Sequence, residues 1–182
     1  MHGWMADRLG DNTARAAGRL TMNPIPHIDL FGSIILPGLL ILSGSGFVIG
    51  WAKPVPFNPY NLRDRRYGAA KVAAAGPLAN LAIALVMGLI LRFLPISYGF
   101  SGFIGLIILV NIVLAVFNLV PIPPLDGSKI LASFLPSKLR HKYEGLERYG
   151  IMIVIAFAFF GFQLISPAIS WLFALFTGSY LY

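Results

Sequence analysis

The sequence predicts an all-α membrane protein, a polytopic helical bundle that includes a re-entrant, partly extended segment. Of its 182 residues, 57% are hydrophobic and only 12% are charged, which is far from the composition of an average soluble domain. Four runs carry no formal charge, and each exceeds or matches the roughly 20 residues of one helical crossing. These runs are Leu30 to Ala52, Val72 to Leu91, Phe93 to Leu125 and Tyr149 to Tyr182. We expect residues 1–182 to form a single domain.

The first 32 residues are polar and are expected to form the end of a helix followed by an interfacial segment. Gly10 is a suitable helix stop, and Asp11 or Asn12 can cap the next turn. Residues 13–20 carry arginines four residues apart with small and apolar residues between them. This pattern favours a short helix at the membrane surface.

Residues 33–57 are unlike a plain spanning helix. Pro37-Gly38 and the Gly/Ser cluster at 43–46 interrupt the apolar run, and prolines at 54 and 56 keep the following stretch extended. The pattern predicts a segment that enters the membrane, turns at 43–46 and returns, buried against protein.

Three ordinary membrane helices are predicted at 69–95, 101–123 and 149–176, the last with a break near Ser166-Pro167. The first contains many small residues, which permit close helix contact, and one amide, Asn80. In the second helix, Asn111 and Asn118 lie seven residues apart and so share a face. All three amides can serve simply to join helices.

Nine of the 14 lysines and arginines lie in two loops, 53–68 and 129–148, and the whole chain has a net charge of +7. Such loops beside apolar runs follow the positive-inside rule, so we expect both in the cytoplasm of a multi-pass protein in the lipid bilayer. A nucleic-acid partner is not expected. The absence of cysteine excludes thiolate chemistry and leaves the redox compartment open.

Asp126 is the most informative polar residue, because 33 uncharged residues separate it from Arg92. The prolines at 121, 123 and 124 cannot continue a regular helix, and the carbonyls that they release need partners. An acid at this depth is costly unless something binds it. Three roles are open from the residues alone: a metal ligand, a proton relay, and a helix cap in good turn chemistry before Gly127.

Several motifs then occur in a fixed order along nearly the whole chain. They are Met1-His2-Gly3-Trp4, Asn23-Pro24 with His27, the stretch Gly50-Trp51-Ala52-Lys53-Pro54-Val55-Pro56, Ala75-Gly76-Pro77 with Asn80, and Asn118-Leu119-Val120-Pro121 leading to Leu125-Asp126-Gly127. Together they resemble the site-2 protease type of intramembrane zinc metalloprotease.

The resemblance implies a zinc-dependent endopeptidase that hydrolyses peptide bonds of membrane-embedded proteins or peptides. His2 would be the second histidine of H-E-x-x-H, Asp126 would be the third zinc ligand, and Asn80 and Asn118 would steer the substrate backbone. Histidines four residues apart lie on one helix face, and the glutamate would take a proton from the attacking water. The extended stretch 47–57 would hold an unwound substrate by strand addition.

One departure from the family pattern concerns the catalytic residues themselves. The first histidine and the glutamate of the motif would stand before Met1, so we expect an N-terminally truncated chain that is inactive as it stands. Its only glutamates, Glu144 and Glu147, lie in the basic loop. We expect His27 to order a turn with Asp29 and His141 to be a solvated loop residue, so neither is a predicted ligand.

Two other classes of function compete with the protease. A non-catalytic membrane scaffold fits a degenerate motif, and a small transporter would also use broken helices and intramembrane polar residues. Because Asp126 opens the basic loop, we expect the site toward the cytoplasmic side of a prokaryotic-type cell membrane. The sequence identifies neither the substrate nor an oligomeric state.

Overall fold

A computed structural model describes residues 1–21, 23–44, 50 and 52–179, and none of these residues lies in a strand. The chain divides into two compact units. One contains Met1–His2 with Arg66–Tyr182, and the other contains Gly3–Arg65. The expected all-helical class is therefore observed for the described residues.

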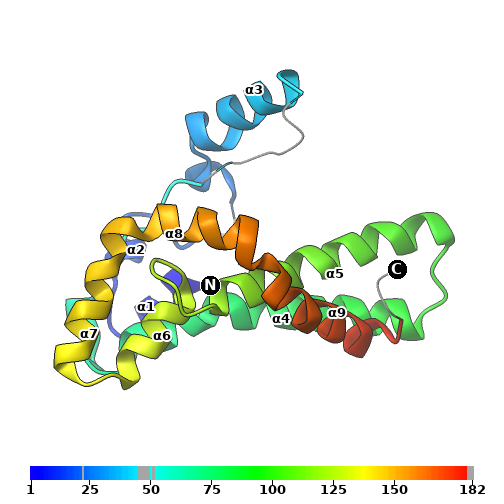
Figure 1. The fold of residues 1–182 in the computed structure, drawn as a ribbon. Coiled ribbons are helices and arrows are strands. Elements are labelled where there is room, and N and C mark those ends of the chain that lie inside the picture. The colour runs from blue at the N-terminus through cyan, green and yellow to red at the C-terminus, as the bar shows by residue number, and fades with distance from the viewer. Residues whose placement is uncertain (22, 45–49, 51, 180–182) are drawn as a thin grey trace. The chain divides into compact units, whose positions relative to one another are not determined.

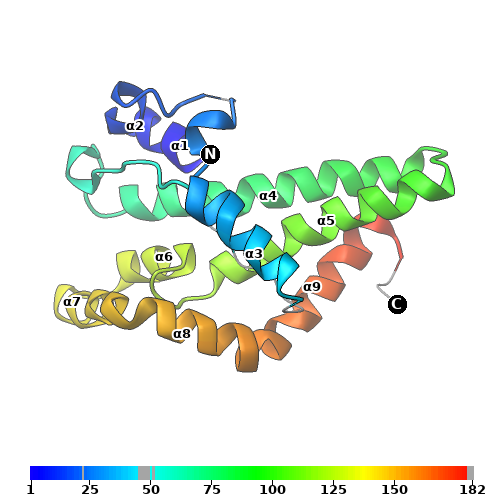
Figure 2. The ribbon, with the colours of Figure 1, turned by 90° about the horizontal axis from the view of Figure 1, so that it is seen from above.

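The larger unit is built on three long apolar helices. These are α4 (Gly68–Phe93), α5 (Tyr98–Leu119) and a continuous helical stretch of α8 (Gly150–Ala156), η5 (Phe157–Gly161) and α9 (Phe162–Thr177). Figures 1 and 2 show α4 and α5 side by side and antiparallel, with α9 packed against both. Among the described residues, three helices have the length and hydropathy to cross a membrane, within residues 68–93, 99–119 and 137–177.

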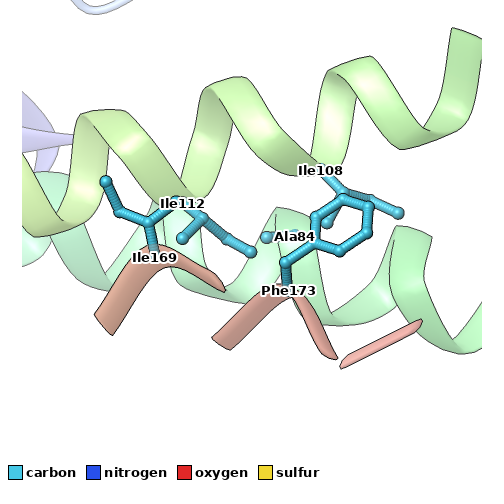
Figure 3. Packing of buried hydrophobic residues seen from close by; sticks show 5 residues of the cluster. All are labelled: Ala84, Ile108, Ile112, Ile169 and Phe173. Atoms are coloured by element: carbon cyan, nitrogen blue, oxygen red, sulfur yellow. The ribbon is translucent and has the colours of Figure 1, made fainter. Parts of the chain in front are cut away.

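A small apolar core joins these three helices (Figure 3). It consists of Ala84 from α4, Ile108 and Ile112 from α5, and Ile169 and Phe173 from α9. A Cβ atom added to Gly88 would lie 2.8 Å from Cβ of Phe176, so this glycine lets α4 and α9 approach closely. Close approach at small residues is a common way to join helices in lipid, where burial of apolar surface gives little driving force.

The second long helix ends four residues earlier than the predicted 101–123. It stops at Leu119 because Val120 adopts extended angles (φ −61°, ψ 131°) directly before Pro121. A residue before proline is driven out of the helical region by the proline ring. The stretch from Val120 to Leu125 is thus a non-helical connection between two helices.

The predicted break at Ser166-Pro167 is wrong, since α9 continues through Pro167. Proline lacks the N–H that would donate to the carbonyl of Gln163. The hydroxyl of Ser166 donates to that carbonyl instead, at 3.0 Å, and so satisfies the group that proline leaves without its usual partner. The irregular part of this helix lies earlier, at the π-helical turn η5.

The basic stretch 129–148, predicted to be a loop, is helical. It contains α6 (Asp126–Phe134), α7 (Ser137–Glu144) and the 3₁₀ turn η4 (Gly145–Tyr149). Pro136 separates α6 from α7, and α6 packs against α4. Asp126 is the first residue of α6, which places its carboxylate at the start of a helix.

The smaller unit contains short helices held by a buried carboxylate. Its elements are the main part of α1 (His2–Arg8), α2 (Thr13–Ala16), η1 (Ile25–His27), η2 (Leu30–Ile35), α3 (Leu36–Leu42) and η3 (Pro59–Asn61). Asp11 is fully buried, and it accepts hydrogen bonds from Asn58 N (2.8 Å), Asn61 Nδ2 (3.0 Å), and both N–H and hydroxyl of Thr13. It therefore ties the end of α1 to residues 58–61.

Of two expectations for this region, one is confirmed and one needs adjustment. Gly10 has φ of 112° and follows the end of α1, as predicted for a helix stop. The predicted helix at 13–20 is shorter than expected, because α2 ends at Ala16 and Gly18 turns the chain with φ of 66°. Positive φ is accessible to glycine without the steric penalty of a Cβ atom.

The residues that flank the apolar segment after Asp29 lie next to each other. Asp29 caps its start by accepting a hydrogen bond from Gly32 N at 2.7 Å, and η2 with α3 forms an apolar helix of Leu30–Leu42, which is shorter than a membrane crossing. At the other end, Lys53 N donates to His27 O at 2.9 Å. Residues 47–49 and 51 of the predicted extended stretch lie outside the described residues, and 52–57 are irregular.

Candidate metal site

The side chains of His2 and Asp126 meet in the larger unit, although 124 positions separate them in sequence. His2 Nε2 lies 3.4 Å from Asp126 Oδ2. The side chain of Asp126 is 17% exposed and that of His2 is 44% exposed, so the carboxylate is the less solvent-accessible member of the pair. The structure thus brings together the two residues that the sequence analysis proposed as metal ligands.

The orientation of the His2 ring is set by α4. His2 Nδ1 lies 2.9 Å from the carbonyl oxygen of Val72, which can only accept a hydrogen bond, so the proton sits on Nδ1. In the neutral ring, Nε2 then directs a lone pair toward the Asp126 carboxylate. A partner that holds the remote nitrogen in this way is typical of metal-binding histidines.

Gly76 makes room for the same ring. A Cβ atom added to this residue would lie only 2.1 Å from His2 Nε2 and 2.4 Å from Cε1. These distances are far inside van der Waals contact, so a side chain at position 76 and the observed ring cannot coexist. The glycine of Ala75-Gly76-Pro77 therefore has a steric role in the site.

Asp126 is placed by the non-helical connection that precedes it. Leu125 N donates to Ile122 O at 2.8 Å, which closes the turn before α6. A Cβ atom at Gly127 would lie 2.1 Å from the carbonyl oxygen of Leu119, so the start of α6 packs directly on the end of α5. From this start of α6, the carboxylate of Asp126 faces His2.

The electrostatics of the pair favour a cation between the two side chains. Burial raises the pKa of the Asp126 carboxyl, and the positive charges of His2, when its ring is protonated, and of Lys129 oppose this effect. A buried carboxylate that faces an imidazole lone pair is unfavourable unless a proton or a metal ion lies between them. The site is thus arranged to bind a positive charge.

The spacing of the pair fits zinc. Zinc lies about 2.0–2.2 Å from histidine nitrogen and carboxylate oxygen in tetrahedral sites, which separates two ligand atoms by roughly 3.3 Å. The observed 3.4 Å agrees with this value. Among the described residues, no group of three or more His, Cys, Asp or Glu side chains could hold a metal ion, so the pair is an incomplete ligand set within this part of the chain.

The amides that the resemblance assigned to substrate have ordinary helical surroundings. Asn118 Nδ2 donates to Leu114 O at 2.8 Å, and Asn111 Nδ2 donates to Ile107 O at 2.8 Å. Asn80 is half-buried within α4. These contacts agree with amides that satisfy their own helix, and a role of Asn80 and Asn118 in substrate binding stays a prediction.

The remaining histidines and Glu144 have surroundings of their own. His27 Nε2 is 3.4 Å from Thr21 O, so this histidine orders the turn through Thr21, whereas Asp29 caps Gly32. His141 is exposed on α7. On the same helix, Glu144 pairs with Arg140 at 2.7 Å.

Sequence reasoning missed two supporting residues, Val72 and Tyr143. The Val72 carbonyl that holds His2 is a backbone group, and backbone groups leave no signal in residue type. Tyr143 Oη donates to Pro121 O at 2.7 Å. The residue type of Tyr143, within a basic helix, does not indicate a hydrogen bond to a proline carbonyl 22 positions earlier. The prolines do predict that the carbonyls without a helical partner need donors from elsewhere.

Comparison with known proteins gives a consistent family assignment. The sequence profile of "Peptidase family M50" matches residues 95–161, which include α5, the connection and Asp126. The chain is 37% identical over 164 residues to YwhC of Bacillus subtilis, which is named as a candidate zinc metalloprotease. This match covers 85% of the chain and 71% of YwhC.

Two further relatives extend the comparison. Rip2 of Mycolicibacterium smegmatis, also named as a candidate zinc metalloprotease, is 33% identical over 178 residues, which cover 96% of the chain and 64% of Rip2. The zinc metalloprotease MJ0392 of Methanocaldococcus jannaschii is 32% identical over 116 residues, covering 61% of the chain and 34% of that protein. The chain thus spans about two thirds of the length of YwhC and of the M. smegmatis Rip2. No solved structure matches the chain.

Proposed function

The chain belongs to peptidase family M50, and on that basis we propose that it is a zinc-dependent intramembrane endopeptidase of the site-2 protease type. Its substrates in this proposal are membrane-embedded proteins or peptides. The observation that carries the proposal is the 3.4 Å approach of His2 Nε2 to Asp126 Oδ2, with the opposite ring nitrogen held by Val72 O.

His2 and Asp126 are the residues of this chain that would hold Zn²⁺. When bound, the metal supplies a Lewis acid and makes water acidic enough to act as a nucleophile near neutral pH. Val72 fixes the ring of His2 so that Nε2 faces the site, and Gly76 leaves the space that this ring needs. Asp126 contributes the negative charge that favours a divalent ion over a neutral ligand.

None of the described residues is proposed as the general base. Glu144 lies on α7 and is engaged by Arg140, and Glu147 lies in η4. In the proposed enzyme, the glutamate of the H-E-x-x-H motif is the general base and the first histidine of the motif is a further zinc ligand, with His2 as the last residue of the motif. Binding of zinc and hydrolysis of a peptide are therefore separable properties of this chain.

In the proposed enzyme, the segment after Asp29 enters the membrane and leaves it on the same side. Because Lys53 N bonds His27 O, both ends of this segment lie at one level in the smaller unit, which supports a re-entrant segment over a full crossing. A substrate helix must be unwound before cleavage, since its carbonyls are engaged in its own hydrogen bonds. The amides of Asn80 and Asn118 are the proposed contacts of the unwound strand.

The proposed location is a prokaryotic-type cell membrane, with the site toward the cytoplasm. Three helices in the described part of the chain are long and apolar enough to cross the bilayer, and the relatives come from bacteria and archaea. Asp126 begins α6, which leads into the basic helix α7. By the positive-inside rule, this end of the larger unit faces the cytoplasm.

A zinc and cleavage assay tests this function. Residues 1–182, and the same residues preceded by an apolar helix that ends in His-Glu at the H-E-x-x-H spacing from His2, are purified and supplied with a membrane-spanning peptide. We expect only the extended chain to cleave the peptide and a chelator to abolish cleavage. Zinc binding without cleavage by the extended chain would favour a non-catalytic membrane scaffold, and absence of zinc binding by both chains would reject the proposal.

A further inference from the structure

The hydroxyl of Tyr143 holds the connection that carries Asp126. Within an α-helix, the carbonyl of Pro121 would accept a hydrogen bond from the N–H of Leu125. In the structure, Leu125 N donates to Ile122 O at 2.8 Å instead. The Pro121 carbonyl is satisfied by Tyr143 Oη at 2.7 Å, a contact between α7 and a residue 22 positions earlier.

The same connection is packed by the helix that follows α7. A Cβ atom added to Gly150, the first residue of α8, would lie 2.6 Å from Pro124 Cδ and 3.1 Å from Pro123 O. The segment from Tyr143 to Gly150 therefore contacts the prolines both through a hydrogen bond and through a close backbone approach. Two residues after Pro124, Asp126 faces His2.

We propose that Tyr143 is a positioning residue for the metal site, because its hydroxyl fixes the proline connection and thereby the direction of the Asp126 carboxylate. This inference rests on the proposed function only in that the site binds zinc. A tyrosine is suited to the task, since its rigid ring spans the distance between α7 and the connection with few rotatable bonds. Removal of a group that orients a metal ligand typically lowers metal affinity about 10–100-fold.

The test uses Tyr143→Phe, which removes only the hydroxyl, and Tyr149→Phe as its matched control. Tyr149 lies six positions further along, is 48% exposed, and contacts Arg148 at 4.7 Å from its ring. Zn²⁺ affinity is measured by competition with a chromophoric chelator. We expect Tyr143→Phe to bind zinc about 10-fold more weakly and Tyr149→Phe to bind it as the unchanged chain does.

A second measurement follows the connection in the absence of metal. The chain has no cysteine, so spin labels can be placed on introduced cysteines at Leu78 of α4 and Leu131 of α6, both of which are exposed. Pulsed electron resonance then gives the distance distribution between α4 and α6. We expect a narrow distribution in the unchanged chain and in Tyr149→Phe, and a shifted or broader one in Tyr143→Phe.

The two measurements separate this inference from the proposed function. A Tyr143→Phe distribution that matches that of Tyr149→Phe would overturn the positioning role, whatever the zinc affinity. If no variant, including the unchanged chain, binds zinc, then the proposed function fails, and the distance measurement alone decides whether Tyr143 holds the connection.

Discussion

The imidazole of His2 occupies the space in which a side chain at Gly76 would lie. Its Nε2 atom is 2.1 Å from the position of a Cβ atom on that glycine. Since Nδ1 of the same ring bonds Val72 O, one turn earlier on α4, the ring rests directly on the helix surface. Any larger residue at position 76 must displace the ring, and with it the proposed ligand atom.

Gly76→Ala is therefore expected to weaken zinc binding at least about 10-fold, because it moves Nε2 away from Asp126. The helix itself should tolerate the change, since alanine is favoured over glycine within helices by about 1 kcal/mol. Isothermal titration with Zn²⁺, together with thermal unfolding, separates these effects. The matched control is Gly105→Ala in α5, where an added Cβ atom meets nothing within 4 Å. Equal zinc affinities of both variants would contradict the steric role.

Asp126→Asn is expected to remove zinc binding while keeping the shape of the side chain. The amide lacks the negative charge and offers a weaker ligand oxygen. The control is Asp29→Asn, in which asparagine preserves the helix cap at Gly32. We expect zinc content, measured after equilibration and desalting, to fall to background in the first variant alone. Retention of zinc by Asp126→Asn would remove this residue from the ligand set.

Acid should loosen the smaller unit through Asp11. Burial raises the pKa of this carboxyl, but hydrogen bonds from Thr13, Asn58 and Asn61 outweigh it, so the pKa lies below the ordinary value. A carboxyl with a lowered pKa stabilises the fold fully above its unfolded pKa of about 3.9 and loses this effect as the pH falls through the folded pKa.

Hydrogen exchange of the Asn58 amide can measure this loss, because that N–H donates to Asp11 Oδ2. Protection should persist down to about pH 4 and fall below it, after correction for the intrinsic exchange rate. In Asp11→Asn, protection should already be weak at neutral pH, since one amide group cannot accept all four hydrogen bonds. Pronounced protection in that variant, equal to that of the unchanged chain, would show that Asp11 does not hold residues 58–61.

The segment between His27 and Lys53 should not cross the membrane. Cysteines introduced singly at Thr21 and Arg63 are the only thiols in each variant, and they flank the segment. An impermeant thiol reagent added to intact cells should label neither position, and both should react once the cells are opened. Labelling of the Thr21 site from outside while the Arg63 site stays protected would establish a full crossing instead.

Much of the fold follows from residue type alone, because uncharged runs and prolines are strong signals in a membrane chain. The three long apolar helices begin and end within a few residues of their predicted bounds. The proline at 121 ended α5 earlier than predicted, while the proline at 167 did not end α9. The difference lies in Ser166, whose hydroxyl bonds the carbonyl that Pro167 leaves without a donor, and a single sequence gives little warning of such compensation.

The candidate site was predictable only in part. His2 and Asp126 were identified by ordered motifs that resemble a known family, and their distance follows from tertiary packing that periodicity cannot supply. The Val72 carbonyl and the contact of Tyr143 with Pro121 were invisible, because both involve backbone oxygens. The small residues of α4 predict close helix packing in general, whereas the neighbour of Gly76 is the ring of His2.

The apolar helix of η2 and α3 has a consequence for how this protein is handled outside a bilayer. Its large side chains are widely exposed, with Leu30 at 67% and Leu42 at 85%, and an isolated helix of this length is marginal in water. In hydrocarbon, by contrast, each backbone amide must keep its hydrogen bond. The helicity of this segment therefore depends on its solvent. The fraction of chains in which the segment is helical is expected to differ between detergent micelles and lipid nanodiscs.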